Sequence, residues 1–209
     1  KDMTYALLNE IDESKAHDYL QCEGLVAPTS TQDGPASSPS DVQEIIRYLN
    51  SATLQPIDSN HTLPGKLVVS LTSYGARFEK LHLTLKSLLL QIVSPDHLIL
   101  WIAENEREDL PESVWQLKKY GLEICFCEDI RPYKKIIPTL REHHNSFIAT
   151  ADDDVYYPND WLQELISGWD GSFKTIVAHR AHKISLDDQG EPISYVKWKW
   201  GVDSKEPID

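Results

Sequence analysis

The sequence is poor in cysteine, lacks a long apolar run and has fewer basic than acidic residues. Its three cysteines, Cys22, Cys125 and Cys127, form neither an even-numbered disulfide framework nor a paired zinc motif, which favours a reducing compartment. No stretch approaches the roughly 20 apolar residues of a membrane-spanning helix, and the acidic start of the chain does not resemble a signal peptide. We therefore expect a cytoplasmic protein without a transmembrane segment, with peripheral association at the inner face of the membrane as an alternative.

The charge balance argues against a nucleic-acid partner. The chain carries 33 acidic and 20 basic residues, which gives a formal net charge of -13 and a pI near 5.0. Sequence-independent binding to nucleic acid needs a basic surface that replaces the counterions around phosphates. We expect no nucleic-acid binding, and an anionic substrate would need local cations.

Residues 1–65 differ in composition from the rest of the chain, because they hold ten acidic residues and three basic ones. Residues 28–40 are rich in Pro, Ser and Gly, which is typical of a linker, and residues 5–21 and 41–50 have helical periodicity. We expect an acidic helical and linker segment over residues 1–65, without chemistry of its own, followed by one domain over residues 66–209.

From Lys66 onward, short apolar runs alternate with amphipathic segments, which indicates strand-helix units around a mostly parallel sheet. The expected strands are LVVSL (67–71), LILWI (98–102), LEICFC (122–127), SFIATA (146–151) and KTIVAH (174–179). A helix is expected over residues 111–121, since proline suits its first turn and glycine the residue after its last one. The stretches KISL and PISYVKWKW predict a C-terminal antiparallel hairpin. The predicted fold class is therefore α/β, with a Rossmann-like sheet flanked by helices.

Three adjacent carboxylates, Asp152, Asp153 and Asp154, follow the predicted strand SFIATA directly. Open α/β sheets bind ligands at the carboxyl ends of their strands. Adjacent like charges repel unless a cation or hydrogen-bond donors stabilise them, and Mg²⁺ and Mn²⁺ favour carboxylate and phosphate oxygens. The triplet therefore indicates a divalent-metal site, whereas a solvated acidic turn is the ordinary alternative for such a triplet taken alone.

The stretches VVSLTSYGARFEKLHLTLKSLLLQ, LILWIAENE and ATADDDVYYPNDWL together resemble the nucleotide-binding half of GT-A glycosyltransferases, close to family-2-like bacterial enzymes, over about residues 66–182. The resemblance implies a nucleoside-diphosphate sugar as donor, with uridine as the expected nucleoside, and Mn²⁺ or Mg²⁺ as cofactor. It further implies that Asp152 contacts the ribose or the metal and that Asp154 binds the metal bridging the diphosphate. Asp153 is counted among the donor-binding residues with its role open.

The resemblance implies further donor contacts outside the triplet. Thr72, Ser73 and Tyr74 match the turn after the first strand, where base and ribose would rest, and Arg77 follows this turn. The alternative is that these are ordinary turn residues. At the end of the second strand, where the family commonly has an aspartate near the base, Glu104 is the candidate substitute.

The segment RPYKK, residues 131–135, places cations at a predicted helix start just before the strand that leads to the triplet. Lys134 and Lys135 are therefore candidates for binding the diphosphate, with a solvated basic face as the alternative. Past the triplet, His179, Arg180 and His182 lack the additional spaced ligands of a zinc site. Contact with the acceptor or with a phosphate is the functional alternative, and plain packing at a strand edge is favoured over both.

The predicted function is transfer of a sugar from this donor to a glycan, a lipid-linked acceptor or another hydroxyl, with metal assistance and inversion. Inversion needs a general base, which the sequence does not identify. Candidates after the triplet include Asp187, Asp188, Glu191 and Asp203, none of which is singled out. We expect that part of the acceptor half is lacking, since 55 residues follow Asp154.

Two other classes of protein remain as alternatives. A metal-dependent nucleotidyltransferase would also use carboxylates on a Rossmann-like core, but TSYGAR stands where its Gly-rich phosphate loop would be. A non-catalytic module that binds nucleotide sugars or glycans fits the short C-terminal region. Release of nucleoside diphosphate would distinguish the enzyme from such a module.

Overall fold

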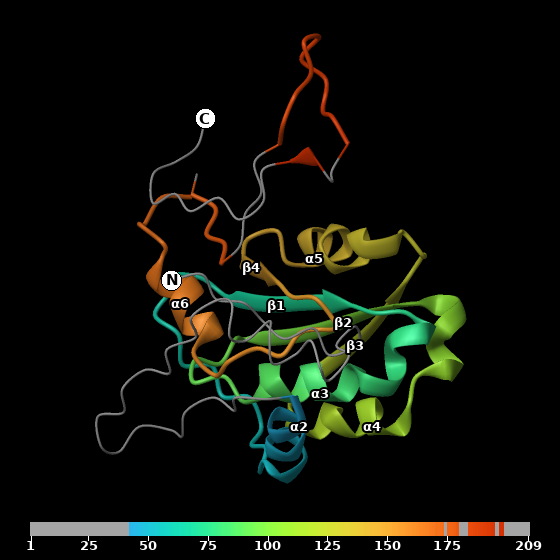
Figure 1. Cartoon of the computed structure of the whole chain (residues 1–209). Coiled ribbons are helices and arrows are strands. Elements are labelled where there is room, and N and C mark those ends of the chain that lie inside the picture. Colours follow the sequence, from blue (N-terminus) through green and yellow to red (C-terminus); the bar gives the residue numbers. More distant parts are fainter. Residues whose placement is uncertain (1–41, 174, 180–183, 195–196, 199–209) are drawn as a thin grey trace.

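A computed structural model describes residues 42–173, 175–179, 184–194 and 197–198 (Figure 1). Four strands form one parallel sheet in the order β3-β2-β1-β4. The strands are β1 (Leu67–Thr72), β2 (His97–Ala103), β3 (Leu122–Cys127) and β4 (Phe147–Thr150). Helices flank this sheet, so the predicted α/β fold is confirmed.

The helices lie on both faces of the sheet. They are α2 (Val42–Ser51), α3 (Phe78–Leu89), α4 (Glu112–Trp115), α5 (Ile137–Glu142) and α6 (Trp161–Ser167). Short 3-10 turns join them to the strands: η1 (Gly75–Arg77), η2 (Glu104–Asp109), η3 (Gln116–Tyr120) and η4 (Arg131–Lys135). In Figure 1, α3 and α4 cover one face of the sheet and α5 covers the other, with α2 packed beyond α3. In the described part of the chain, no helix has the length and apolar character needed to cross a bilayer.

Alternation of side chains along the strands divides the core between the two faces of the sheet. Leu67, Val69 and Leu71 of β1 belong to the main apolar cluster, which contains Leu81 and Leu85 of α3. The opposite face of the sheet carries another cluster, whose buried members are Val68, Ile99 and Trp101. Both faces are covered, which explains why these strands are almost continuously apolar in sequence.

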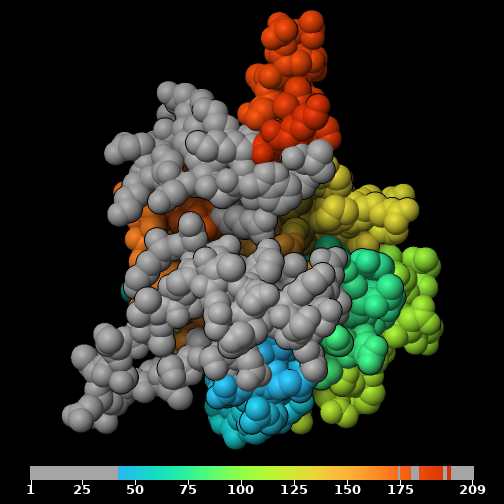
Figure 2. Space-filling model, viewed as in Figure 1, coloured from blue at the N-terminus to red at the C-terminus, as the bar shows by residue number. Residues whose placement is uncertain are grey.

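Residues 42–65 pack on the domain. Helix α2 agrees with the predicted helix over residues 41–50, and it buries Ile45 and Leu49 against Leu83 and Tyr156. Leu54 belongs to the main core, and the amide of Ile57 donates to the carbonyl of Tyr120 at 3.0 Å. Figure 2 shows α2 on the surface, in blue. The helix predicted over residues 5–21 and the linker over residues 28–40 lie outside the described residues.

The predicted strand over residues 174–179 is wrong for the part of it that the structure describes, since residues 175–179 form no strand. The start of this segment forms local hydrogen bonds instead: the Asp170 carboxylate accepts from the Ser172 amide at 2.8 Å and from the Thr175 hydroxyl at 2.9 Å. Such local bonds hold a turn in place of a sheet ladder. The side chain of Ile176 is consequently 93% exposed.

The region of the predicted C-terminal hairpin contains one isolated antiparallel bridge, between Leu186 and Pro192. A turn that includes Gly190, at φ 83°, closes this bridge. The segment projects from the body of the molecule (Figure 2). Next to this bridge, the amide of Ile193 donates to the carbonyl of Ser185 at 2.9 Å. Of the predicted hairpin, residues 183, 195–196 and 199–200 lie outside the described residues, and these include Val196 and Trp200.

Candidate functional site

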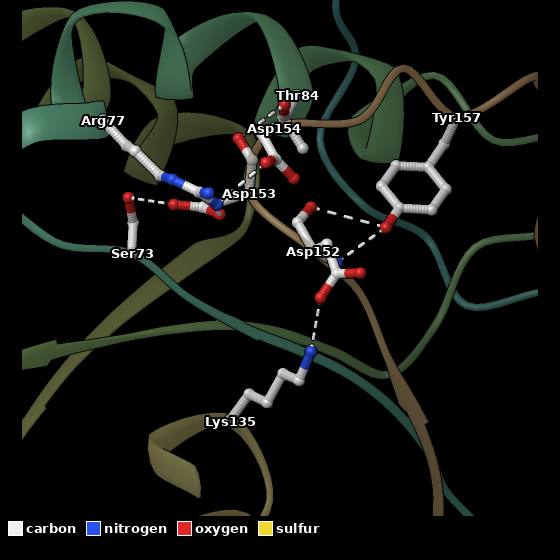
Figure 3. Close-up of polar contacts among 8 residues, drawn as sticks. All are labelled: Ser73, Arg77, Thr84, Lys135, Asp152, Asp153, Asp154 and Tyr157. Carbon is white, nitrogen blue, oxygen red and sulfur yellow. Dashed lines mark hydrogen bonds and ion pairs between the residues drawn. The ribbon is translucent and has the colours of Figure 1, made fainter. Parts of the chain in front are cut away.

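The acidic triplet lies at the point where the strand order of the sheet reverses. The chain proceeds from β1 through β2 to β3 in one direction, and β4 then pairs with the opposite edge of β1. Ligands of open α/β sheets bind outside the carboxyl ends of the strands at such a switch point. The triplet follows β4 and therefore lies beside the turn after β1, as Figure 3 shows.

Asp153 is the inner member of the triplet, with a side chain that is 7% exposed. Its carboxylate accepts a hydrogen bond from the Ser73 hydroxyl at 2.5 Å and another from the Arg77 guanidinium at 2.8 Å. Its carbonyl accepts from the Thr84 hydroxyl of α3 at 2.9 Å. Asp153 therefore connects the turn after β1, helix α3 and the end of β4.

Arg77 also forms an ion pair with Asp154, through the same terminal nitrogen and at the same distance of 2.8 Å. Burial is the main cause that raises the pKa of Asp154; the charge of Arg77 opposes this effect, and those of Asp153 and Asp152 reinforce it. Burial also works to lower the pKa of Arg77, but the hydrogen bond to Asp153 and the charges of both carboxylates outweigh it. The inner part of the site therefore has more negative charge than its own guanidinium can balance.

Asp152 is the exposed member of the triplet, with 63% of its side chain accessible. Its carboxylate accepts a hydrogen bond from the Lys135 ammonium at 2.5 Å. Its backbone amide donates to the Tyr157 hydroxyl at 2.7 Å, and that hydroxyl comes from a buried ring. Burial raises the pKa of Tyr157, so its hydroxyl stays protonated at neutral pH. Lys135 and Tyr157 thus fix the side chain and the backbone of the same residue.

The two adjacent lysines of η4 have different partners. Lys134 is buried, and its ammonium donates to the Asp129 carboxylate at 2.7 Å. Lys135 reaches Asp152. The structure therefore brings Lys135 to the triplet and places Lys134 against the loop before η4.

The turn after β1 presents residues of different kinds. The Thr72 hydroxyl donates to the Trp101 carbonyl of β2 at 2.8 Å, so it holds two strands together. Tyr74 is 48% exposed, and the Arg77 guanidinium lies over its ring at 5.3 Å from the centroid. The Gly75 amide donates to the Glu106 carboxylate at 2.9 Å, which fixes this turn against η2.

Glu104 lies on the surface at the carboxyl end of β2. Its carboxylate accepts hydrogen bonds from Nε and Nη2 of Arg107 at 3.1 and 2.9 Å. The Arg107 guanidinium in turn lies over the Phe126 ring, 3.6 Å from the centroid. Glu104 therefore lies at the same end of the sheet as the triplet, but its carboxylate is paired with Arg107 of the same 3-10 turn.

The later candidates that the structure describes contact α6 or belong to the projecting turn. His179 Nε2 is 3.0 Å from the Trp161 carbonyl, beside α6. Asp187 accepts hydrogen bonds from the amides of Gln189 and Glu191 and holds the projecting turn, with Asp188 exposed beside it. The other residues named for this region, Arg180, His182 and Asp203, lie outside the described residues.

Sequence reasoning missed Thr84 and Tyr157 as supports of the triplet. Thr84 is a fully buried polar residue between Leu81 and Leu85 of α3, and a hydroxyl on an apolar helix face was the available signal. Tyr157 follows the triplet closely, but a tyrosine beside a strand end is more often plain core.

A divalent metal would need oxygen ligands, which Asp152 and Asp154 can supply. Among the described residues, no group of three or more His, Cys, Asp or Glu side chains is arranged to hold a metal ion. Two cations, Arg77 and Lys135, face three carboxylates. This shortfall of positive charge, together with the raised pKa of Asp154, is what a bound cation would relieve. The residues therefore fit a metal, provided that other ligands, such as phosphate oxygens, complete its shell.

No family model, no curated protein and no solved structure matches this chain.

Proposed function

We propose that the chain is a GT-A type glycosyltransferase that binds a nucleoside-diphosphate sugar, with uridine as the nucleoside, at the carboxyl ends of β1 and β4. The observation that carries this proposal is the convergence of one guanidinium and one ammonium on an acidic triplet at the switch point of a parallel sheet. Such a set of groups can bind a metal and a diphosphate together, because each cation now paired with a carboxylate can move to a phosphate.

Each residue of the triplet has a separate role in this proposal. Asp152 and Asp154 hold Mn²⁺ or Mg²⁺ together with the diphosphate oxygens, and Asp153 keeps the turn after β1 in place. When bound, the metal neutralises charge that develops on the departing nucleoside diphosphate. Lys135 and Arg77 add positive charge to the same oxygens. The partly exposed ring of Tyr74 is the surface on which the nucleoside rests.

A non-catalytic module that binds nucleotide sugars is the second candidate. One observation favours it: the carboxylates considered as the general base that the structure describes, Asp187, Asp188 and Glu191, are exposed in the projecting turn. An inverting transfer to a glycan, a lipid-linked acceptor or another hydroxyl needs a base near the acceptor.

We propose the cytoplasm as the compartment, because Cys125 and Cys127 are free thiols.

The first test is calorimetric titration of UDP and of UDP-sugars, with Mn²⁺ and after thorough chelation. We expect at least tenfold tighter binding with the metal, since the acidic triplet alone repels the diphosphate. The variant Lys135→Met should weaken binding, and the control Lys118→Met, at an exposed lysine, should leave it close to wild type. Equal affinity with and without metal would contradict the metal site, and equal effects of the two lysine variants would contradict the assignment of Lys135.

The second test follows release of nucleoside diphosphate from the UDP-sugars with candidate acceptors. Acceptor-dependent release establishes transfer, whereas tight binding without release establishes the binding module. Absence of any nucleotide binding, in folded protein, would contradict both candidates.

A further inference from the structure

A buried polar network lies between the sheet and the segment that carries Lys135. The Ser70 hydroxyl of β1 donates to the Lys135 carbonyl at 2.7 Å, and it lies 2.8 Å from the Thr139 hydroxyl of α5. Thr139 is also 3.1 Å from that carbonyl, and the Trp101 indole of β2 donates to its hydroxyl at 2.8 Å. Ser70, Trp101 and Thr139 are almost completely inaccessible to solvent.

The protons of this network lead to one acceptor. Each hydroxyl has a single proton to donate, and the indole proton is already directed at Thr139. If the Ser70 and Thr139 hydroxyls form a hydrogen bond with each other, the one that accepts in this bond still has its own proton and donates it to the Lys135 carbonyl. If they form no such bond, both hydroxyls donate to the Lys135 carbonyl. The Lys135 carbonyl therefore receives at least one buried hydroxyl in every arrangement that these distances allow.

The position of the network is unusual for this face of the sheet. Its neighbours Val68 and Ile99 are apolar. The hydrogen bonds of a buried hydroxyl largely offset the cost of removing it from water, so the net gain in stability is small. An apolar residue at position 139 could fill the same space. What the hydroxyls add is a fixed location for one backbone group, in the residue whose ammonium binds Asp152.

The opposite end of η4 is fixed as well. The Asp129 carboxylate accepts hydrogen bonds from the Arg131 amide at 3.0 Å and from the Lys134 ammonium at 2.7 Å. In a 3-10 turn, successive side chains point about 120° apart. The two anchors therefore decide which of the adjacent lysines faces the triplet.

We propose that Ser70, Trp101 and Thr139 are positioning residues that hold the Lys135 backbone so that its ammonium reaches Asp152. For its effect on ligand binding, this inference rests on the proposed function, in which Lys135 moves to the diphosphate. Loss of the network frees the η4 turn to shift, and Lys135 then spends less time at the triplet.

The experiment measures Lys135 directly, without a ligand. Amine acylation followed by mass spectrometry gives the modification rate of Lys135 relative to the exposed Lys118. We expect the double variant Ser70→Ala/Thr139→Val, which leaves the Lys135 carbonyl without a buried hydroxyl, to raise this rate about fivefold, as the loss of one hydrogen bond allows. Asp152→Asn gives the rate of a released lysine. The control Val114→Ala, in the apolar core under α4, matches the loss of stability and should leave the rate unchanged.

A double-mutant cycle with UDP and Mn²⁺ then separates positioning from ligand binding. Removal of both hydroxyls by Ser70→Ala/Thr139→Val should weaken UDP binding several-fold in the wild-type chain and have no further effect in Lys135→Met. An unchanged Lys135 rate in the double variant Ser70→Ala/Thr139→Val would overturn the inference. A raised rate with unchanged UDP affinity would leave the positioning role standing and would instead contradict the role of Lys135 in the proposed function.

Discussion

Arg77 and Asp153 form an ion pair of 2.8 Å that joins the turn after β1 to the end of β4. The two residues are 76 positions apart in sequence, and the carboxylate is almost completely buried. Ser73 donates to the other oxygen of the same carboxylate. A buried charge with two such donors is first a structural connection, and it places the Arg77 guanidinium beside Asp154.

We expect Arg77→Gln to lower the free energy of unfolding by about 1–3 kcal/mol, because it leaves a buried carboxylate with fewer charged donors. Urea denaturation at neutral pH measures this loss. The control Arg107→Gln removes an exposed ion pair with Glu104 and should cost about 1 kcal/mol or less. Equal losses in the two variants would show that Asp153 does not depend on Arg77.

Asp154→Asn should be as stable as the wild type at pH 7, or more stable. Burial raises the pKa of Asp154 in the folded protein, so the native state holds this proton more tightly than the unfolded chain, whose carboxyl has a pKa of about 3.9. Wild-type stability from this group therefore falls as pH rises from about 4 through the raised pKa, and the variant lacks this fall.

Denaturation of Asp154→Asn and wild type at pH 7, 6, 5 and 4 measures the difference, which should shrink toward pH 4. The same variant should bind UDP more weakly with Mn²⁺. A large loss of stability at pH 7 would mean that Asp154 is a structural partner of Arg77 rather than a metal ligand.

Tyr157→Phe keeps the buried ring but removes the hydroxyl that accepts a hydrogen bond from the Asp152 amide. We expect a loss of about 0.5–1.5 kcal/mol in the free energy of unfolding, as for one hydrogen bond. Binding of UDP with Mn²⁺ should also weaken, because the backbone of Asp152 is no longer fixed. Tyr133→Phe, at an exposed ring, is the matched control and should change neither quantity. Unchanged UDP binding in Tyr157→Phe would assign its hydroxyl to stability alone.

Gly121→Ala should destabilise the domain. Gly121 has φ 102°, and an added Cβ would lie 3.0 Å from the Cβ of Ile57. The left-handed backbone alone costs about 1–2 kcal/mol for a residue with a side chain. Gly65→Ala is the control, since its Cβ would meet only ordinary contacts with Phe147 at 3.6 Å. Thermal unfolding compares the two, and equal midpoints would contradict the strain at Gly121.

Local patterns in the sequence were enough to predict most of the regular elements. The apolar runs at residues 67–71, 98–102, 122–127 and 146–151 became β1 to β4. Gly121 ends the α4 and η3 turns in the left-handed conformation, as its position after a predicted helix indicated. Residues 175–179 of the predicted strand form no strand, because local hydrogen bonds to Asp170 hold the start of this segment in a turn.

An α/β domain with three carboxylates at the end of a strand follows from strand and helix periods and from the order of residues, which are local properties. The meeting of Arg77 with Asp153 and Asp154, and the contact of Lys135 rather than Lys134 with Asp152, come from the packing of distant segments. The first pairing depends on β4 joining the free edge of β1, and the second depends on how hydroxyls from β1 and α5 fix the η4 turn. Both are contacts between distant segments, whose energies no local pattern contains.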